Sequence, residues 1–347
     1  MSGTDRLEAY HTFEDRIKKS LNCDCRYLVL DFVEERDFLF IFVDSIVGAR
    51  IISHEYQKKA PGFKIKVVLL PDEGVGDMRR GLCHVGVAPV RRHHASASEQ
   101  VTQLLYGESF DTLQIVDDWI RVRLHADGYL GWVAAKQVTL FDDKSFYEYD
   151  YTSKFVVCEK VVSLLEKPDA TSPAVREAVM GTQVSVSGRS GKFLQVRTPD
   201  GTTAYIYESS VQYSRLQKEF SVANLIEDAR SFLGISYVWG GRSTKGFDCS
   251  GFTQTVFRMN GIEIPRDADA QFTSGKYVGK KIKDLKTGDL LFFSSNGDKI
   301  SHVGLYLGKN GRFIHSSGFV RINSFDRTRR DYDKKLRSRF VGACRVI

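Results

Sequence analysis

The sequence predicts an α+β protein in which two small all-β domains precede a C-terminal domain of mixed helices and strands. Two observations lead to this prediction. Residues 82–140 and 157–212 are two copies of one unit of short strands and turns, and residues 222–347 contain both helical and strand-like spacings of apolar side chains. The length of 347 residues suits two or three domains. We expect domains at 81–140, 150–213 and 220–347, preceded by a region at 1–80.

The composition is that of an ordinary globular protein. Hydrophobic residues make up 42% of the chain and charged residues 27%, which excludes a wholly disordered, collagen-like or disulfide-scaffold chain. No apolar run approaches the roughly 18 residues that a membrane-spanning helix needs. The net charge is +7, and much of it lies in residues 321–339. We interpret this run as a solvated basic face rather than a nucleic-acid site, because no aromatic interleaving accompanies it.

The cysteine content bears on the cellular compartment. The 6 cysteines are too sparse for a disulfide framework in a chain of this length, so we expect free thiols in a reducing compartment. The charged, apolar and small-residue pattern of a secretory leader does not follow Met1. We therefore expect a cytoplasmic protein, with a periplasmic or secreted protein already trimmed of its leader as the alternative.

Residues 1–80 are predicted to begin with a helix followed by strands. Apolar side chains recur there at spacings of three and four, and the runs at 26–32 and 38–43 are strand-like. Cys23 and Cys25 stand at CxC spacing, but a metal site would need two further ligands and none is evident, so we expect two ordinary cysteines. The region is either an elaborated entry to the first β-domain or a separate docking element. The apolar residues of the predicted helix are Leu7, Tyr10, Phe13, Ile17 and Leu21.

The two all-β copies share a pattern of apolar and turn residues. Trp119-Ile-Arg-Val in the first copy corresponds to Phe193-Leu-Gln-Val in the second, and Gly131-Trp-Val corresponds to Ala204-Tyr-Ile. An Asp-Gly turn lies between these strands in each copy. The pattern resembles bacterial SH3-like barrels, which implies binding or positioning modules. We expect the connector between the copies at 141–156 and the next boundary near 213–222.

The C-terminal region holds a candidate nucleophile. A helix predicted over about 222–233 ends at Gly234, and the apolar spacing after Cys249 predicts a second helix that begins near this cysteine. Backbone N–H groups and the helix dipole at such a position stabilise a thiolate and lower its pKa from about 8.5. The alternative is a buried, inert cysteine. The neighbouring Asp248 and Ser250 favour the nucleophile, since an apolar pocket would not be flanked by them.

A thiolate nucleophile needs a base, and His302 is the leading candidate. It lies in an alternating strand-like run, a turn follows at 308–311, and the next strand holds His315. If the turn is a four-residue loop, the two histidines lie on one face as diagonal neighbours, which is the arrangement of a base and its orienting partner. The alternatives are two surface histidines or, together with Cys249, a zinc site. The wide spacing of these three residues in the sequence disfavours zinc.

Short motifs recur in a fixed order through the C-terminal region. They are Tyr237-Val-Trp-Gly-Gly, Asp248-Cys-Ser-Gly-Phe, Ile264-Pro-Arg-Asp, Gly288-Asp-Leu-Leu-Phe-Phe, Ser301-His-Val-Gly-Leu-Tyr and Phe313-Ile-His-Ser-Ser. In this order they resemble the NlpC-type family of cell-wall cysteine peptidases. The resemblance implies a papain-like fold without metal or organic cofactor, with Cys249 as nucleophile, His302 as base and His315 orienting that base. The backbone N–H of Cys249 and the hydroxyl of Tyr237 would form the oxyanion hole, with a core role for the Tyr237 ring as the alternative.

Together with the SH3-like copies, residues 82–347 are similar to γ-D-glutamyl-L-diamino acid endopeptidases of the dipeptidyl-peptidase VI type. This resemblance implies cleavage after D-glutamate in murein peptides that have a free N-terminal L-alanine. The amine of that alanine would be bound by Glu99, Tyr129 and Asp248. The alternatives are a solvated helix residue for Glu99 and packing within the barrel for Tyr129.

Further residues fall on the substrate side of the family's cleft. The resemblance places Ser250, Arg266 and Asp267 there, with a structural ion pair as the alternative for Arg266. Ala268 departs from the family, which has a serine at this position, so a substrate hydrogen bond would be lost.

The expected activity is that of a cysteine peptidase acting on murein peptides in peptidoglycan degradation or recycling. We expect a monomer whose partner is the peptide substrate, without nucleic acid. An amidase or acyltransferase on the same fold, and a non-catalytic cell-wall-binding protein, are the alternatives. The sequence does not distinguish diaminopimelate from lysine as the diamino acid.

Overall fold

A computed structural model describes residues 3–56, 64–149, 154–213, 220–295, 297, 299–308 and 311–347. The chain divides into two compact units. The first unit comprises residues 1–82, 92–98 and 109–148, and the second comprises residues 83–91, 99–108 and 149–347. Among the described residues, no helix is both long enough and apolar enough to cross a membrane.

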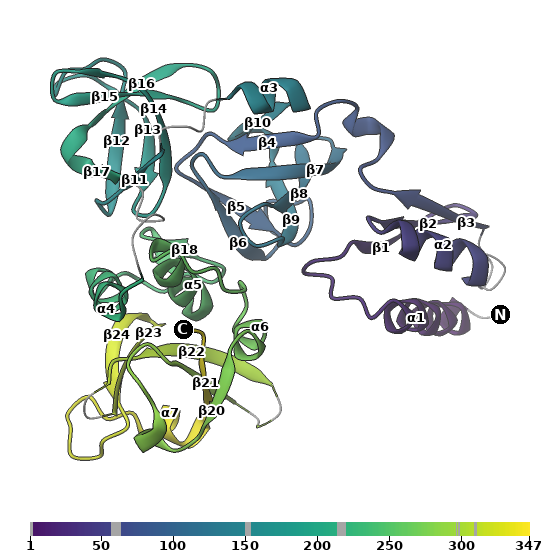
Figure 1. Ribbon diagram of the computed structural model, residues 1–347. Helices are drawn as coiled ribbons and strands as arrows, with labels where there is room; N and C mark the ends of the chain where they lie inside the picture. Colours follow the sequence, from purple (N-terminus) through teal and green to yellow (C-terminus); the bar gives the residue numbers. More distant parts are fainter. Residues whose placement is uncertain are drawn as a thin grey trace. The chain divides into compact units, whose positions relative to one another are not determined.

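The N-terminal part of the first unit has a hydrophobic core of its own. The strands pair in the order β1-β2-β3, antiparallel between β1 and β2 and parallel between β2 and β3. Leu39, Ile41 and Val43 alternate along β2 and are buried on one face, where Phe13 and Ile17 of α1 pack against them (Figure 1). The elements are α1 Gly3–Ser20, β1 Leu30–Glu35, β2 Phe38–Val43, α2 Ile46–Ile51 and β3 Lys64–Leu69, with a π-helical turn at Ile52–Tyr56.

The first predicted strand begins later than expected, at residue 30 instead of 26. The carboxylate of Asp24 accepts hydrogen bonds from the backbone N–H and the guanidinium of Arg26, and the backbone N–H groups of Tyr27 and Leu28 donate to the carbonyl of Asp24. These bonds hold residues 24–28 in a turn, so the extended backbone starts only after it.

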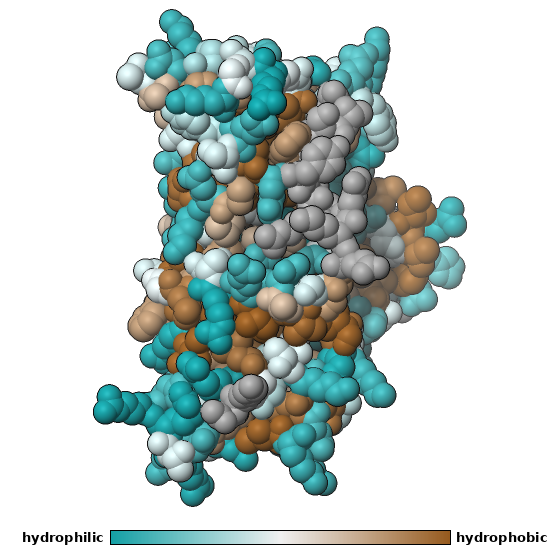
Figure 2. Space-filling view, turned by 60° about the vertical axis from the view of Figure 1, so that its left-hand side comes forward, coloured by the Kyte–Doolittle hydropathy of each residue, from teal (hydrophilic) through white to brown (hydrophobic). Residues whose placement is uncertain are grey.

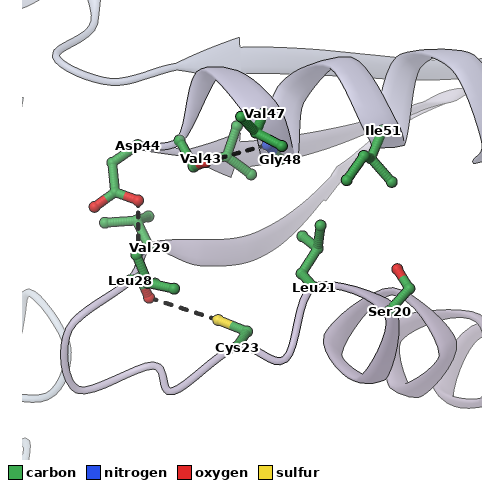
Figure 3. A pocket seen from close by; sticks show the side chains of 11 residues that line it. Ser20, Leu21, Cys23, Leu28, Val29, Val43, Asp44, Val47, Gly48 and Ile51 are labelled. Atoms are coloured by element: carbon green, nitrogen blue, oxygen red, sulfur yellow. Dashed lines mark hydrogen bonds between the residues drawn. The ribbon is translucent and has the colours of Figure 1, made fainter.

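A pocket of about 160 Å³ lies between α1, α2 and the loop that precedes β1 (Figure 3). Its lining is mainly apolar, with Leu21, just after α1, pointing toward Ile51 of α2, and the Asp44 carboxylate accepts a hydrogen bond from the backbone N–H of Val29. Cys23 also lines the pocket, and its Sγ lies 3.6 Å from the Sγ of Cys25.

The first SH3-like copy is divided between the two units. Its strands in the first unit pair in the order β10-β4-β7-β8-β9, and the antiparallel hairpin of β5 and β6 belongs to the second unit. The predicted connector at 141–156 contains a short helix, and part of it, residues 150–153, lies outside the described residues. The elements are β4 Arg80–Cys83, β5 Val87–Arg91, β6 Gln100–Leu105, β7 Ser109–Val116, β8 Trp119–Leu124, β9 Leu130–Ala134, β10 Val138–Phe141 and α3 Asp143–Glu148.

The second SH3-like copy forms an antiparallel sheet in the order β13-β12-β16-β15-β14-β11-β17. Its core is made of aliphatic side chains such as Leu164, Val196 and Ile206, and Tyr106 from the end of the β5–β6 hairpin is buried among them. The boundary predicted near 213–222 falls largely on residues 214–219, outside the described residues. The strands are β11 Lys154–Val157, β12 Val161–Leu165, β13 Ala174–Val179, β14 Gln183–Ser190, β15 Phe193–Arg197, β16 Thr203–Tyr207 and β17 Val211–Tyr213.

The C-terminal domain is built on a sheet in the order β20-β25-β21-β22-β23-β24. Helices α4 and α5 pack on one face through Leu225, Phe252 and Val256, and α7 covers the other face, where Phe293 and Phe313 are buried (Figure 1). The elements are α4 Val222–Ser231, β18 Arg242–Ser243, β19 Gly246–Phe247, α5 Cys249–Met259, α6 Ala268–Thr273, β20 Lys276–Gly279, β21 Leu290–Ser294, β22 Ile300–Tyr306, β23 Arg312–Ser317, β24 Phe319–Ser324, α7 Lys334–Arg339 and β25 Phe340–Arg345.

The surface agrees with the ordinary composition of the chain. Hydrophilic and hydrophobic residues are interspersed over the face shown in Figure 2. Apolar atoms cover more than half of a typical globular surface, so this mixture calls for no further explanation. The expectation of a mixed α+β protein in which all-β parts precede a C-terminal domain of helices and strands is confirmed.

Candidate active site

Cys249 is the first residue of α5, at the position that the apolar spacing predicts. Asp248 is the N-cap, and its Oδ1 accepts a hydrogen bond of 2.6 Å from the backbone N–H of Gly251. A capping carboxylate satisfies one of the free N–H groups of the first turn and favours the helix start. The backbone N–H of Cys249 belongs to this first turn, so it has no helical carbonyl to bind and is available to an oxyanion.

The expectation that the helix start keeps Cys249 ionised is wrong for the substrate-free protein. Burial raises the pKa of the Cys249 thiol to about 12, and the neighbouring Asp248 carboxylate raises it further. The residue is only 9% exposed. Loss of hydration disfavours the thiolate more than the helix N-terminus favours it. The thiol is therefore protonated at neutral pH until a base takes its proton.

The two candidate histidines meet on adjacent strands. Leu305 pairs with Ile314 and Tyr306 with Phe313, which is the register that a four-residue loop predicts, although residues 309 and 310 lie outside the described residues. The Nε2 of His302 lies 2.8 Å from the Nδ1 of His315. The expected diagonal contact of the two imidazoles is thus present.

Gly304 makes room for this contact. A Cβ at position 304 would lie 3.1 Å from the Cβ of His315 and 3.2 Å from the carbonyl oxygen of Ile314. Both distances are shorter than ordinary van der Waals contact. A larger residue at position 304 would push His315 away from His302. Close packing therefore explains the glycine in the Ser301-His-Val-Gly motif.

Asn323 completes a chain of hydrogen bonds that the sequence analysis did not identify. Its Nδ2 donates to the carbonyl of Asp331, so its Oδ1 faces the Nε2 of His315 at 2.9 Å. Because a carbonyl oxygen only accepts, His315 carries its proton on Nε2 and accepts on Nδ1. His302 then carries its proton on Nε2, and its Nδ1 is left to accept the thiol proton. Extending the strand pairing past the turn at Gly318 would have placed residue 323 on this face.

Both imidazoles are neutral at physiological pH. Burial lowers the pKa of His302 to about 3, with smaller contributions from the charges of His315 and Arg321. Burial also lowers the pKa of His315 to about 4. The backbone N–H of Val303, next to His302, lowers the pKa of Cys249 slightly against the effect of burial, so the thiol lies near the strand that holds the base. A neutral imidazole beside a neutral thiol can act as a general base.

Tyr237 lies close to the nucleophile. Its backbone N–H donates to the carbonyl of Gly318, and it forms a bridge with Phe247, just before Asp248. Burial raises the pKa of the Tyr237 hydroxyl, and charges on Cys249 and Asp248 raise it further. The hydroxyl therefore stays protonated and can donate a hydrogen bond beside the thiol.

Arg266 has the structural role that was the alternative to substrate binding. It is fully buried, and its Nη2 lies 2.6 Å from Oδ2 of Asp248. Its Nη1 donates to the Ser250 hydroxyl and its Nε to the Thr102 hydroxyl. These bonds occupy the guanidinium and fix Asp248 and Ser250, so Arg266 is a positioning residue. Ser250 is also buried, at 5% exposure.

Glu99 lies in the loop before β6 rather than in a helix. Its Oε1 accepts a hydrogen bond of 2.9 Å from the indole N–H of Trp239, and the side chain of Gln100 donates to the Trp239 carbonyl at 2.7 Å. Trp239 is 63% exposed. The exposed carboxylate of Glu99 is thus held beside the Tyr237-Val-Trp motif, within the second unit. The role of Trp239 in fixing it was missed from the sequence.

The remaining candidates have other surroundings. Tyr129 belongs to the first unit, where its buried ring packs edge-to-face on Tyr27 with centroids 5.6 Å apart. Asp267 precedes α6, and its carbonyl accepts the first helical hydrogen bond, from Gln271. Ala268 begins α6 and packs against the domain core.

A buried ion cluster links the β5–β6 hairpin to the C-terminal domain. Arg242 and Arg258 both pair with Glu108, and Gln103 accepts a hydrogen bond from the backbone N–H of Arg242. Although burial alone raises the pKa of Glu108, the two arginines lower it to about 2. The sequence pattern gave no sign of this cluster, because Glu108 lies more than a hundred residues before Arg242 and Arg258.

Within the described part of the chain, no group of three or more His, Cys, Asp or Glu side chains is placed to hold a metal ion. His302, His315 and Cys249 do not form such a group. The hydrogen bonds of the two histidines, to one another and to Asn323, are those of a proton-transfer chain.

Comparison with known proteins identifies three family profiles along the chain. The profile of the NlpC/P60 family matches residues 234–339, that of the bacterial dipeptidyl-peptidase Sh3 domain residues 90–138, and that of the bacterial SH3 domain residues 160–212.

The chain is similar to curated proteins over most of its length. It is 31% identical over 237 residues to the gamma-D-glutamyl-L-lysine dipeptidyl-peptidase of Bacillus cereus, covering 64% of this chain and 68% of that protein. It is 33% identical over 224 residues to the protein of the same name from Bacillus subtilis, covering 62% of this chain and 71% of the relative. The crystal structure of an NlpC/P60 family protein from Bacillus cereus superposes with a TM-score of 0.67 at 24% identity, covering 77% of this chain and 99% of that one.

Proposed function

Because the chain belongs to the NlpC/P60 family of cysteine peptidases, we propose that it cleaves murein peptides between γ-D-glutamate and an L-diamino acid. We further propose that its substrates have a free N-terminal L-alanine. The hydrogen-bonded order Asn323–His315–His302 supports the peptidase chemistry, because it leaves one imidazole nitrogen free to deprotonate a thiol. The names of the Bacillus relatives support the choice of bond.

The reaction follows from the groups at the site. The thiol proton of Cys249 moves to Nδ1 of His302 as the sulfur bonds to the γ-carbonyl carbon of D-glutamate. The oxyanion that forms is stabilised by the backbone N–H of Cys249 and the hydroxyl of Tyr237. The C–N bond then breaks, His302 gives its proton to the departing amine, and a thioester remains. Water, deprotonated by His302, attacks the thioester and releases L-Ala-D-Glu with the thiol restored.

Ionisation of the thiol accompanies substrate attack. Burial favours the neutral pair, with the pKa of Cys249 raised and that of His302 lowered. The base therefore takes the proton when the electrophile is in place, as in general base catalysis. His315 and Asn323 stabilise the imidazolium, since each accepts a hydrogen bond from the preceding group.

Glu99 is the proposed anion for the free amine of the substrate. Its carboxylate is exposed and its orientation is fixed by the indole N–H of Trp239. An ammonium group beside a positioned carboxylate forms a charge-assisted hydrogen bond. Asp248 has a weaker claim, because Arg266 and the backbone of Gly251 already use its oxygens. Tyr129 stays a candidate from the family resemblance.

The test is cleavage of synthetic L-Ala-γ-D-Glu-L-Lys and of its N-acetylated twin, followed by mass spectrometry. We expect release of L-Ala-D-Glu from the free peptide, at least roughly tenfold faster than from the acetylated one. Cys249→Ala should abolish release while the unfolding transition stays intact. Glu99→Gln should remove the preference for the free amine. Release of ammonia or of an acylated product instead of L-Ala-D-Glu would identify an amidase or acyltransferase.

A role in murein recycling, a cytoplasmic location and a monomeric state stay predictions. Recycling fits a requirement for short peptides with a free amine, because uncut wall strands lack that amine. A wall-binding protein would sediment with sacculi, whereas a recycling enzyme would stay in the supernatant. Cell fractionation tests the location, and sedimentation of the purified full chain tests the oligomeric state.

A further inference from the structure

Arg321 lies beside the catalytic histidines on the edge strand of the C-terminal sheet. It pairs directly with His315 across β23 and β24. Side chains of directly paired residues in antiparallel strands lie on the same face, a few ångströms apart. Asn323, which binds His315, is two residues further along β24 and shares this face. The guanidinium is therefore next to the proton-transfer chain.

No ion pair or hydrogen bond joins the Arg321 guanidinium to the described residues, and its Nε is buried without a partner. The group stacks on the Phe319 ring, 5.7 Å from its centroid. Arg266 and Arg345 of the same domain differ, since Arg266 pairs with Asp248 and Arg345 with Asp289. A buried N–H without an acceptor is costly, so an incoming anion would gain from binding here.

The charge of Arg321 reaches both imidazoles. It contributes to the lowered pKa of His302 and to that of His315. The fold does not need a cation here to orient His315, because Asn323 already binds that imidazole. The positive charge of Arg321 instead disfavours the imidazolium form of the histidines. An anion bound at Arg321 would offset this effect during the reaction.

The chemistry of the leaving group supplies such an anion. His302 must give its proton to the departing amine, so that amine lies on the histidine side of the scissile bond. In a diamino acid the α-carboxylate is attached to the carbon that bears this amine. Arg266, the buried arginine beside Asp248, has its guanidinium engaged and is fully buried.

Resting on the proposed function, we propose that Arg321 binds the α-carboxylate of the departing diamino acid and so selects peptides that end at that residue. A planar guanidinium can bind a carboxylate through two parallel hydrogen bonds. The ligand class is a C-terminal α-amino-acid carboxylate, and the Phe319 ring holds the guanidinium plane beside it.

The test compares L-Ala-γ-D-Glu-L-Lys with the same peptide ending in lysinamide. For the wild-type chain we expect kcat/KM to be roughly tenfold or more higher for the carboxylate. Arg321→Gln should abolish this preference, so that kcat/KM for the carboxylate peptide falls to that of the amide peptide measured with the same variant. Arg321→Lys should restore part of the preference, since it keeps the charge but not the paired donors.

Arg337→Gln is the matched control, because Arg337 also stacks on a phenylalanine ring, 5.5 Å from the centroid of Phe325. Arg337→Gln should keep the full wild-type preference for the carboxylate peptide over the amide peptide. Equal wild-type rates on the two peptides would overturn the role of Arg321 while leaving the proposed function intact. An equal loss on both peptides in Arg321→Gln would also overturn it, as a purely structural effect. Failure to cleave either peptide would overturn the proposed function and this inference with it.

Discussion

The Nε2 of His302 lies 2.8 Å from the Nδ1 of His315, and this contact decides which nitrogen is the base. Since His315 donates its own Nε2 proton to Asn323, its Nδ1 can only accept. His302 is thereby held with a free Nδ1. The orientation of the base thus depends on a residue that makes no contact with substrate in the proposed reaction.

Replacing Asn323 by alanine tests this dependence. Without the amide oxygen, His315 can adopt the other tautomer, and the base loses its fixed orientation. We expect kcat/KM to fall roughly tenfold to a hundredfold, which is less than the loss of a whole general base. Initial rates on the tripeptide give this value.

Asn260 offers a control in the same domain. Its side chain binds the Asp228 carboxylate and the carbonyl of Val256 at the end of α5. Asn260→Ala should lower the melting temperature and leave kcat/KM close to wild type. If Asn323→Ala behaved like this control, Asn323 would be a structural residue only.

The pH profile of kcat/KM should extend further into acid than that of an ordinary histidine base. Burial lowers the pKa of His302 to about 3, so the imidazole stays a base as the pH falls through 6.5. Protonation removes the base only near the lowered pKa, and kcat/KM reports the groups of the free enzyme. We expect no inflection near pH 6.5 between pH 5 and 8, roughly the range over which an unperturbed histidine titrates.

Rates measured in buffers of constant ionic strength test this prediction. Arg321→Gln should move the acid limb toward neutral pH, because the arginine's charge contributes to the lowered pKa. An acid limb centred near the ordinary histidine value in the wild-type chain would show that His302 is hydrated in solution.

We expect the Glu108 carboxylate to contribute strongly to the unfolding free energy of the second unit. Glu108→Gln leaves the buried Arg242 and the half-buried Arg258 without their anion, and removal of one partner from a buried pair costs about 3 kcal/mol or more of unfolding free energy. Glu177→Gln is the control, because its pair with Lys245 is exposed and such pairs contribute about 1 kcal/mol or less. Denaturant unfolding of the two variants gives both values.

The same carboxylate predicts acid sensitivity. The pKa of Glu108 is lowered from 4.5 to about 2 in the folded state, so its stabilisation is complete above pH 4.5 and is lost as the pH falls toward 2. Glu108→Gln should be less sensitive to pH over this interval. If both proteins lost stability equally between these values, another group would be responsible.

The sequence was sufficient for the parts of the site that depend on local pattern. The apolar spacing located the start of α5 at Cys249, and strand alternation with a four-residue turn placed His302 beside His315. Both features follow from the spacing of residues within a single helix or a single β-hairpin. Asn323 could be placed beside His315 only by recognising a second hairpin, formed by β23 and β24 with its turn at Gly318. This tight turn was not recognised from the sequence.

Properties that depend on distant packing could not be predicted. A thiolate at Cys249 was expected only from its position at the start of a helix. The pKa of the thiol depends instead on burial, which is due to strands some fifty residues away in the sequence. The contacts of Glu108 and Trp239 join the β5–β6 hairpin to the C-terminal domain across more than a hundred residues. The periodicity of apolar residues within a short stretch of sequence gives no information about such distant pairs.

Thiol reactivity should separate Cys25 from Cys249. The hydrogen bond from Cys23 lowers the pKa of Cys25 to about 7, and Cys25 is exposed. Cys249 is buried and its pKa is raised to about 12. Because the thiolate is the reacting form, iodoacetamide at pH 7 should alkylate Cys25 well before Cys249. Peptide mass spectrometry over a time course gives the order. Cys23→Ala should slow the labelling of Cys25 by removing the donor beside it, whereas Cys344→Ala, in the core of the C-terminal domain, should leave it unchanged. Faster labelling of Cys249 would mean that the catalytic thiol is ionised before substrate binds, and His302 would then act first as an imidazolium partner of the thiolate.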